Sequence, residues 1–578
     1  MKKRHLSTKN LADFLQSESR YSWSAVQRVL NADPEKSLAT GEVLGPLKAV
    51  NRDKRGLVLR ATGIYFSRFR SGDQVDVGCI DSQTRKFQKI SGTTVKDIRY
   101  PEPGILEVIV PGKLLPTDGI ELFLLPSDSS GIAKIIRGKL LDLPRLGGSA
   151  AYRPINHTRA LENFERVTEG LNATQIEALK FLGNNDFRGL VQGPPGTGKT
   201  HLLTALVHLA LESGLRVGLA SLAHSAIDNA LARIIEGNVN NDWVARIASN
   251  PEKVKTEPYR KLGISLPVYR SFKDLEDDDG DIRLYAATMH AWCMTNSLPE
   301  IDILIIDEAS QVPLYFYPFF EKISSRIIMF GDHKQLPPVI QLPKHDLPAE
   351  DVFSFEIEQG WYPMLETQYR MNSKIQHWSS HRFYDGRLQP HAKNRERDVL
   401  HGLPSTSGLL GAHQVNLVSH RGRANHHRNQ HEASRVADLV SALQAEGKVP
   451  LSEIGIVTPH RAQAGAIYNE LQQKLGLERS THVLVDTVER FQGQEREAMI
   501  FSVGVESDNA KPGEKEFLGD GRRLNVAVTR ARSRFYCFAP ETLVDRTLAR
   551  SGDGHLKSLI AWCDSSNTTK ARNSKNTA

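Results

Sequence analysis

One stretch governs the interpretation of this sequence: Gly193-Pro194-Pro195-Gly196-Thr197-Gly198-Lys199-Thr200. A short apolar segment, Gly189-Leu190-Val191, precedes it, and a helical pattern from His201 to about Leu211 follows it. The stretch therefore has the pattern G-x-x-x-x-G-K-[ST] in the strand–loop–helix context that the pattern requires. Glycines let successive backbone N–H groups turn toward a phosphate, and the helix N-terminus adds a favourable partial charge. We predict a loop that binds ATP, with Lys199 at the β and γ phosphates and the Thr200 hydroxyl on Mg²⁺.

A pair of acidic residues supplies the second part of a hydrolytic site. The apolar run Ile303-Leu304-Ile305-Ile306 ends in Asp307 and Glu308. A buried strand can place Asp307 beside a Mg²⁺ ion, and Glu308 can polarise an attacking water. An Asp-Glu pair at a strand end is usually only a solvated turn. Its position after a phosphate loop favours the catalytic interpretation.

Apolar segments alternate with helical stretches from about Arg153 onward. This alternation is typical of parallel sheets covered by helices on both faces. A break near residues 346–351 predicts two tandem α/β domains. The expected strands of the two series are Gly189–Val191, Val217–Leu219, Ile303–Ile306 and Ile327–Phe330, then Ile454–Val457, Val483–Val485, Met499–Val503 and Phe535–Phe538.

The N-terminal part has a different pattern of apolar and polar residues. Apolar spacing predicts helix over residues 10–38, and short β-branched runs between Gly41 and Pro126 predict a small β-barrel or sandwich. Its basic segment, residues 48–99, is either a solvated strand face or a nucleic-acid surface. The expected division is a helical segment (1–40), a β-rich domain (41–145), two α/β domains (146–346 and 347–562) and a disordered basic tail (563–578).

Composition and residue counts exclude several classes of protein. Hydrophobic residues make up 40% and charged residues 24%, as in ordinary globular proteins, and the net charge of +7 is mild. Four widely spaced cysteines argue against a zinc module or a disulfide framework, so we expect a reducing, cytoplasmic location. No apolar run is long enough for a membrane span. Neither a zinc-ligand spacing nor a nuclease constellation is evident, and His426, His427 and His431 are interpreted as solvated.

Further segments resemble, in the correct order, the motifs of a known family. They are Asp307-Glu308-Ala309-Ser310-Gln311, Gly331-Asp332-His333-Lys334-Gln335, Leu365-Glu366-Thr367-Gln368-Tyr369-Arg370, Ile456-Val457-Thr458-Pro459-His460-Arg461-Ala462-Gln463, Asp486-Thr487-Val488-Glu489-Arg490-Phe491-Gln492-Gly493-Gln494-Glu495 and Asn525-Val526-Ala527-Val528-Thr529-Arg530. The set resembles the up-frameshift and senataxin-like branch of superfamily 1B helicases over about residues 170–540. The resemblance implies an α/β fold with two tandem RecA-like domains that clamp ATP, preceded by a β-barrel.

The resemblance also implies roles for individual residues. Catalysis falls to Lys199, Asp307, Glu308, Gln335, Arg370 and Arg530, the two arginines reaching the γ-phosphate. The nucleotide contacts outside the phosphate loop fall to Gln175 at the adenine edge, Tyr369 stacked on the base, and Gly493 and Glu495 near the ribose. Expected nucleic-acid contacts are His224, Ser225, Thr288, Pro459 and Thr487. Relatives often have Pro-Ser-Asn where this chain has Leu222-Ala223-His224, so a packed His224 is an equal alternative.

These features together predict an ATP-dependent helicase or translocase that moves 5′ to 3′ along single-stranded nucleic acid. Two alternatives remain open: a translocase that displaces bound protein without unwinding duplex, and a nucleotide-switched interaction module. The sequence does not distinguish DNA from RNA, because phosphate contacts carry no such information. It also leaves room for a protein partner that supplies a further activity.

Overall fold

The computed structural model describes residues 6–567 apart from 40, 64–66, 68, 103, 112–119, 129, 147–163, 238, 277–279, 344, 359, 361, 402–408, 412, 425–427, 492, 506–517 and 550–553. His426, His427, Gln492 and residues 568–578 of the expected tail therefore lie outside the described residues. Contacts divide the chain into two compact units. The first unit contains residues 1–23 and 129–369, and the second contains residues 24–128 and 370–578.

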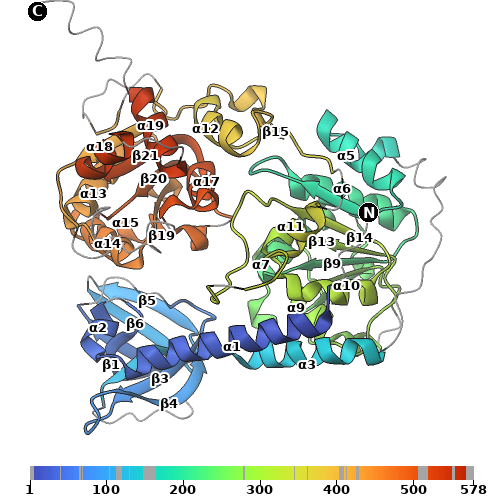
Figure 1. Ribbon diagram of the computed structural model, residues 1–578, viewed down its shortest axis with the longest axis horizontal. Coiled ribbons are helices and arrows are strands. Elements are labelled where there is room, and N and C mark those ends of the chain that lie inside the picture. Colours follow the sequence, from blue (N-terminus) through green and yellow to red (C-terminus); the bar gives the residue numbers. More distant parts are fainter. Residues whose placement is uncertain are drawn as a thin grey trace, which may run out of the picture. The chain divides into compact units, whose positions relative to one another are not determined.

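The first unit is built on a seven-stranded parallel sheet in the order β11-β10-β12-β9-β13-β14-β8 (Figure 1). Its strands are β8 (Gly189–Gln192), β9 (Val217–Ser221), β10 (Val244–Ile247), β11 (Val268–Tyr269), β12 (Leu284–Thr288), β13 (Ile303–Ile306) and β14 (Ile327–Gly331). Its helices include α5 (Ala173–Asn184), α6 (Lys199–Glu212), α7 (His224–Glu236), α8 (Glu257–Lys261), α9 (Met289–Met294), α10 (Tyr317–Ile323) and α11 (Val352–Ile357). All four strands expected from the first apolar series are present.

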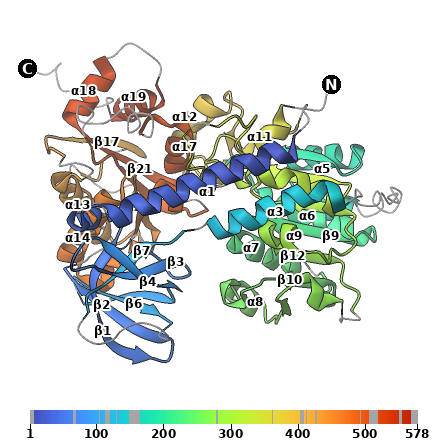
Figure 2. The ribbon, with the colours of Figure 1, turned by 60° about the horizontal axis from the view of Figure 1, so that its bottom comes forward.

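Both faces of this sheet are buried, which explains why most residues of its strands are apolar. Along β13, Ile303 and Ile305 belong to a core shared with α5, α6 and α7, whereas Leu304 and Ile306 belong to the opposite core. Successive strand residues point to opposite faces, so a strand covered on both sides has few positions that reach solvent. The second core also contains residues of α1 (Thr8–Asn31) and α3 (Ser130–Leu146), which lie side by side (Figures 1 and 2).

The second unit contains a five-stranded parallel sheet in the order β17-β21-β20-β18-β19. Its strands are β17 (Val415–His420), β18 (Ile454–Thr458), β19 (Leu484–Thr487), β20 (Arg496–Ser502) and β21 (Ala531–Pro540). Its helices are α12 (Ser373–Phe383), α13 (Gln430–Ala445), α14 (Arg461–Leu475), α15 (Leu477–Ser480), α17 (Gly521–Thr529), α18 (Glu541–Ala549) and α19 (His555–Asn567). Two parallel α/β sheets confirm the predicted fold class.

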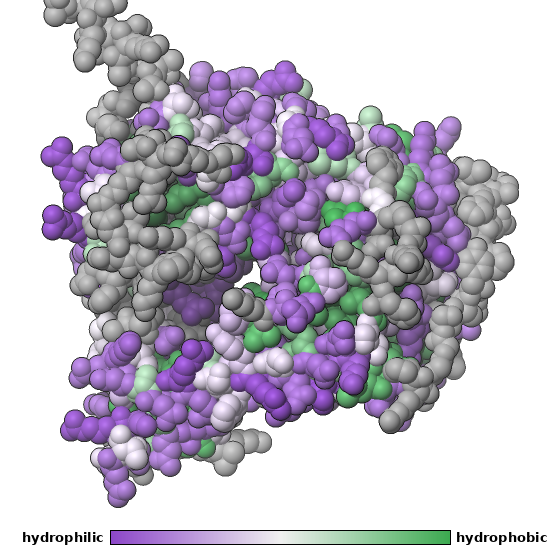
Figure 3. All heavy atoms as spheres, in the orientation of Figure 1, coloured by the Kyte–Doolittle hydropathy of each residue, from purple (hydrophilic) through white to green (hydrophobic). Residues whose placement is uncertain are grey.

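The same unit includes an antiparallel β domain with the strand order β4-β3-β7-β1-β2-β6-β5. Its strands are β1 (Leu44–Asp53), β2 (Gly56–Thr62), β3 (Gln74–Ile80), β4 (Phe87–Thr94), β5 (Asp97–Glu102), β6 (Ile105–Val110) and β7 (Leu122–Pro126). Side chains from both halves of the sheet meet in one apolar core. Hydrophilic side chains dominate the domain's visible surface (Figure 3).

The structure differs from the sequence-based expectation in three segments. The helix expected over residues 10–38 is two helices, because Pro34 begins α2 (Pro34–Ala39) and Asp33 accepts a hydrogen bond from the Glu35 N–H. Residues 130–145 of the expected β-rich domain belong to helix α3 (Ser130–Leu146), whose Ile136 and Leu140 pack in the first unit's core. Helix α19 continues to Asn567, into the expected tail. Within the described residues, no helix is both long and apolar enough to cross a membrane.

Candidate functional site

The phosphate loop connects β8 to α6 at the carboxyl end of the first sheet. Gly196 and Gly198 adopt φ angles of +76° and +78°, in the left-handed region that favours glycine. A Cβ atom on Gly193 would lie 2.0 Å from Cγ of Lys199, so only glycine lets the loop fold over that side chain. Strands β13, β14 and β8 are parallel and lie in this order in the sheet, so the carboxyl ends of β13 and β14 lie at the same edge as the phosphate loop. The loop predicted from the sequence therefore has the backbone geometry of an anion cradle.

Lys199 is held at this edge by contacts that a bound phosphate could replace. Its Nζ donates a hydrogen bond of 2.9 Å to the Gly193 carbonyl and lies 3.9 Å from Glu308 Oε1. The side chain is 12% exposed and sits at the start of α6. Because the ammonium has only a loose ion pair, it keeps most of its charge available for an anion.

The two acidic residues follow β13 directly. Asp307 is buried, and burial together with the charge of Glu308 raises the pKa of its carboxyl, while Lys199 opposes the rise. The Glu308 N–H donates to Asp307 Oδ1 at 2.9 Å. Glu308 itself adopts a φ of +52°, a left-handed conformation that is uncommon for a residue with a Cβ. This backbone turn sends the Glu308 side chain toward Lys199 while Asp307 stays buried.

Gln335 is fixed at the same edge through Asp332. The Gln335 amide donates to Asp332 Oδ2 at 3.0 Å, and the Gln192 amide donates to the other carboxylate oxygen at 3.1 Å. The Gly193 N–H also donates to the Gly331 carbonyl at 2.9 Å. Hydrogen bonds to Asp332 thus connect Gln335, the predicted γ-phosphate sensor, to Gln192, which directly precedes Gly193 of the phosphate loop.

Gln175 and Tyr369 lie on the outer side of the phosphate loop. The Gln175 amide donates to the carbonyls of Thr197 and Gly198 at 3.1 and 3.4 Å, and its oxygen accepts from the Asn172 N–H. The Tyr369 hydroxyl accepts a hydrogen bond from the Asn172 side chain at 2.8 Å, and 41% of Tyr369 is exposed. Gln175 supports the loop here, so reading an adenine edge would require it to release these contacts. The Tyr369 ring remains accessible for stacking.

The predicted arginines of the second unit lie together with Glu495. Arg370 donates to Glu495 Oε2 at 2.5 Å and to the Thr529 carbonyl at 3.0 Å. Arg530 is 2% exposed and donates to the Val526 carbonyl at 3.3 Å. Burial alone would raise the pKa of Glu495, but Arg370 and then Arg532 and Arg530 bring it below its usual value.

Other predicted and neighbouring residues complete this cluster. Gly493, two residues before Glu495, has a φ of +78° and open space at its Cβ position. Arg532 contacts the carboxylates of Glu453, Glu497 and Glu495, the last two at 3.1 and 3.6 Å. These contacts give Arg532 a structural role in the cluster.

The candidate nucleic-acid residues of the first unit make structural contacts. His224 begins α7, and its Nδ1 accepts from Arg246 at 3.0 Å, since a guanidinium only donates. Burial and the Arg246 charge lower the pKa of His224. This is the packed arrangement that the sequence left open, and Ser225 follows in the same helical turn. Thr288 is 8% exposed, and its hydroxyl caps α9 by accepting from the Ala291 N–H at 3.3 Å.

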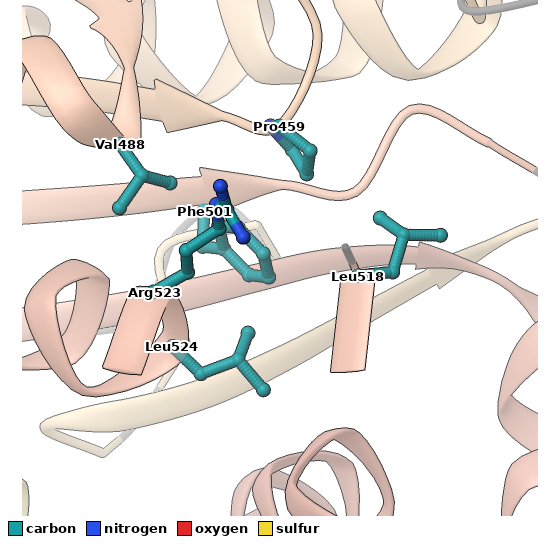
Figure 4. A pocket seen from close by; sticks show the side chains of 6 residues that line it. All are labelled: Pro459, Val488, Phe501, Leu518, Arg523 and Leu524. Carbon is teal, nitrogen blue, oxygen red and sulfur yellow. The ribbon is translucent and has the colours of Figure 1, made fainter. Parts of the chain in front are cut away.

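The two candidates of the second unit lie at the carboxyl ends of neighbouring strands. Pro459 follows β18 and lines a small pocket with Val488, Phe501, Leu518, Arg523 and Leu524 (Figure 4). Thr487 ends β19 and is 7% exposed, with its N–H donating to Asp486 Oδ1. A phosphate contact by any of these five residues stays a prediction.

Comparisons with known proteins agree with the geometry. Two family models, both described as AAA domain, match residues 170–402 and 352–541. The DNA replication ATP-dependent helicase/nuclease DNA2 of Gallus gallus is 28% identical over 529 residues, covering 90% of this chain and 49% of the relative. Regulator of nonsense transcripts 1 homolog of Neurospora crassa is 29% identical, covering 63% of this chain and 36% of the relative. By sequence the chain is therefore similar to helicases of the up-frameshift and DNA2-like branch of superfamily 1B.

The chain differs in extent from several of those relatives. It spans about half the length of the Gallus gallus protein. The DNA polymerase alpha-associated DNA helicase A of Saccharomyces cerevisiae is 25% identical, covering 71% of this chain and 70% of that protein. The arterivirus nonstructural protein 10 helicase overlays with a TM-score of 0.38 at 12% identity, covering 82% and 78% of the two chains.

Several residues that shape the candidate site were missed by sequence reasoning. Asn172 caps α5 and holds Tyr369, and the spacing Asn172-x-x-Gln175 is a capping-box signal that could have revealed it. Asp228 and Arg246 form a fully buried ion pair of 2.9 Å that also receives the Tyr259 hydroxyl. No sequence signal predicts that pair, because its members come from a helix and a distant strand.

Proposed function

We propose that the protein is an ATP-dependent helicase that couples ATP hydrolysis to 5′-to-3′ movement along single-stranded nucleic acid. The observation that supports the proposal best is the arrangement of Lys199, Asp307 and Glu308 at one sheet edge beside the phosphate loop. Lys199 and Glu308 lie 3.9 Å apart, and a triphosphate that takes the lysine would free the glutamate. The similarity to helicases adds the expectation that the protein moves along a nucleic-acid strand.

The residues at this edge fit a magnesium ion. Thr200 and Asp307 offer a hydroxyl and a carboxylate, the hard oxygen ligands that Mg²⁺ prefers alongside phosphate oxygens. The raised pKa of buried Asp307 shows a carboxylate that lacks full compensation, which a divalent cation would provide. No cluster of three or more His, Cys, Asp or Glu ligands exists among the described residues, so the phosphates would complete the coordination. When bound, Mg²⁺ would neutralise charge on the transferring phosphoryl group.

The hydrolytic step follows from the positions of the chain's own groups. Glu308 would orient a water and accept its proton as the water oxygen bonds to the γ-phosphorus. The bond from the γ-phosphorus to the bridging oxygen breaks, which releases ADP and phosphate. Lys199 would balance charge on the β and γ oxygens, and Gln335 would sense the γ-phosphate. Arg370 and Arg530 retain their predicted role at the same phosphate.

The test is ATP turnover measured in parallel with single-stranded DNA, single-stranded RNA and duplex. We expect strong stimulation by single strands and release of the complementary strand from a duplex with a 5′ tail. Lys199→Ala should lower turnover by roughly 10²–10³-fold, since it removes charge stabilisation at the phosphates. Slow turnover that ignores nucleic acid would reject the helicase proposal and favour a nucleotide switch.

A further inference from the structure

A buried hydroxyl at the end of β9 has no hydrogen-bond partner within the described residues. Ser221, the last residue of β9, is 1% exposed, and its Oγ makes no hydrogen bond to any of them. A hydroxyl buried without a partner is costly, so such groups in native proteins are usually satisfied by water or by a ligand. The Ser221 hydroxyl therefore points to a contact with a molecule other than the protein.

Ser221 lies beside Asp307 at the carboxyl edge of the first sheet. Strands β9 and β13 are parallel neighbours with Ala220 opposite Ile306, and the Asp307 N–H donates to the Ala220 carbonyl at 2.9 Å. The next pair along the two strands is therefore Ser221 and Asp307. Because neighbouring strands are about 5 Å apart, the two residues are adjacent across the sheet.

The two side chains also lie on one face of the sheet. Leu219 of β9 and Ile305 of β13 both belong to the core shared with α5, α6 and α7. Side chains two residues apart along a strand point to the same face, so Ser221 and Asp307 both face the side of α6. Thr200 lies in the first turn of α6. The Ser221 hydroxyl is thus on the side of the sheet where Thr200 and Asp307 offer oxygen ligands to Mg²⁺.

The position of Ser221 suits the hydration shell of the ion better than direct coordination. Strands β13 and β14 lie between β9 and β8, the strand that leads into the phosphate loop. Ser221 is therefore on the far side of Asp307 from the phosphates. Mg²⁺ usually keeps several of its waters in protein sites, so a water can fill the space between the ion and this hydroxyl.

We propose that the Ser221 hydroxyl accepts a hydrogen bond from a water bound to the magnesium ion that accompanies ATP. The inference rests on the proposed function, because it adds a residue to the same site. A cation polarises its waters and makes them strong donors, which satisfies a buried hydroxyl without adding a charge. Ser221 is then a positioning residue: it holds the ion through the water and does not touch the reacting phosphate.

The test is Mn²⁺ binding by the full chain with ADP, measured from the electron paramagnetic resonance signal of the free ion. Mn²⁺ accepts the same oxygen ligands in the same octahedral geometry as Mg²⁺. Ser221→Ala should weaken Mn²⁺ binding roughly tenfold, while ADP binding in EDTA stays unchanged. Ser221→Thr keeps the hydroxyl and should restore the Mn²⁺ affinity. Equal Mn²⁺ affinity in Ser221→Ala and the unaltered chain would overturn the proposal.

Ser324 provides a matched control in the same unit. It is 0% exposed and precedes β14, and its Oγ donates to the Asp302 carbonyl at 3.0 Å and accepts from the Arg326 N–H at 3.1 Å. Ser324→Ala removes both hydrogen bonds, so the melting temperature should fall while Mn²⁺ affinity stays unchanged. Ser221→Ala removes no hydrogen bond among the described residues, so its melting temperature should not fall. A fall as large as that of Ser324→Ala would make Ser221 a structural residue and overturn the proposal.

The same titrations separate this inference from the proposed function. If the unaltered chain binds Mn²⁺ in the presence of ADP and Ser221→Ala binds it equally well, the inference fails while the proposed function stands. If ADP gives the unaltered chain no Mn²⁺ site, the proposed function fails together with the inference.

Discussion

Charged residues lie at the carboxyl ends of the strands in the first parallel sheet and at the amino ends of the strands in the second, and the two sets of charges are held differently. In the first unit, Lys199 and Glu308 stay 3.9 Å apart, and Asp307 is buried with a raised pKa. In the second unit, Arg370 pairs with Glu495 at 2.5 Å, and Arg532 contacts three carboxylates. The first edge keeps its charges separate, whereas the second neutralises them internally.

This difference shows which edge is prepared for a ligand. Separated charges at the first edge can interact with a triphosphate and a cation without first breaking strong contacts. The arginines of the second edge must exchange a carboxylate or carbonyl partner before they can contact a phosphate. We therefore expect changes at the second edge to affect turnover more than ATP affinity. Changes at the first edge should lower either turnover or ATP affinity, according to which group is removed.

The largest effect should come from Arg530. Arg530→Lys keeps a positive charge but loses the planar donor set that stabilises the transferring phosphoryl group. We expect turnover to fall roughly 10³-fold while ATP affinity changes little. Steady-state ATPase assays and equilibrium binding of a fluorescent ATP analogue would separate the two quantities. Turnover within a factor of about three of the original would contradict the assigned role and remove the second edge from the chemistry.

Glu308 should give the next effect. Glu308→Gln preserves size and removes the acceptor for the proton of the attacking water, so turnover should fall at least about 10²-fold. ATP binding should persist, because the phosphate loop and Lys199 are unchanged. Single-turnover hydrolysis beside nucleotide binding would measure both quantities. Hydrolysis at the original rate would show that Glu308 is only a structural turn residue.

Gln175 should give the smallest effect, on binding rather than on chemistry. Gln175→Met keeps most of the volume but leaves the Thr197 and Gly198 carbonyls without their donor, at a cost of about 1–3 kcal/mol. We expect ATP affinity to fall roughly tenfold with turnover at saturation nearly unchanged. Isothermal titration with a slowly hydrolysed analogue would measure the change. A loss of turnover at saturating ATP would instead place Gln175 in the chemistry.

Several parts of the fold escaped prediction for identifiable physical reasons. Strand β4 buries only Phe87 along its length, because it lies at the edge of its sheet and leaves most side chains exposed. Such a strand has no apolar run for sequence reasoning to detect. Strand β10 is only four residues long and contains Arg246, whose charge is tolerated because Asp228 pairs with it. In both cases, distant neighbours determined the environment of the strand.

The sequence by itself determined the phosphate loop, the acidic strand end and the two parallel sheets. These features depend on local rules: glycines permit the left-handed turns at Gly196 and Gly198, and a strand buried on both faces is mostly apolar. Only the tertiary structure decided that Gln175 supports the loop, that Thr288 caps a helix and that Arg70 reaches Asp486. Each of the Gln175 and Arg70 contacts joins elements far apart in the chain, and a capping hydrogen bond depends on where the helix begins. Hydrogen bonds and ion pairs depend on such geometry, which residue types and spacing do not specify.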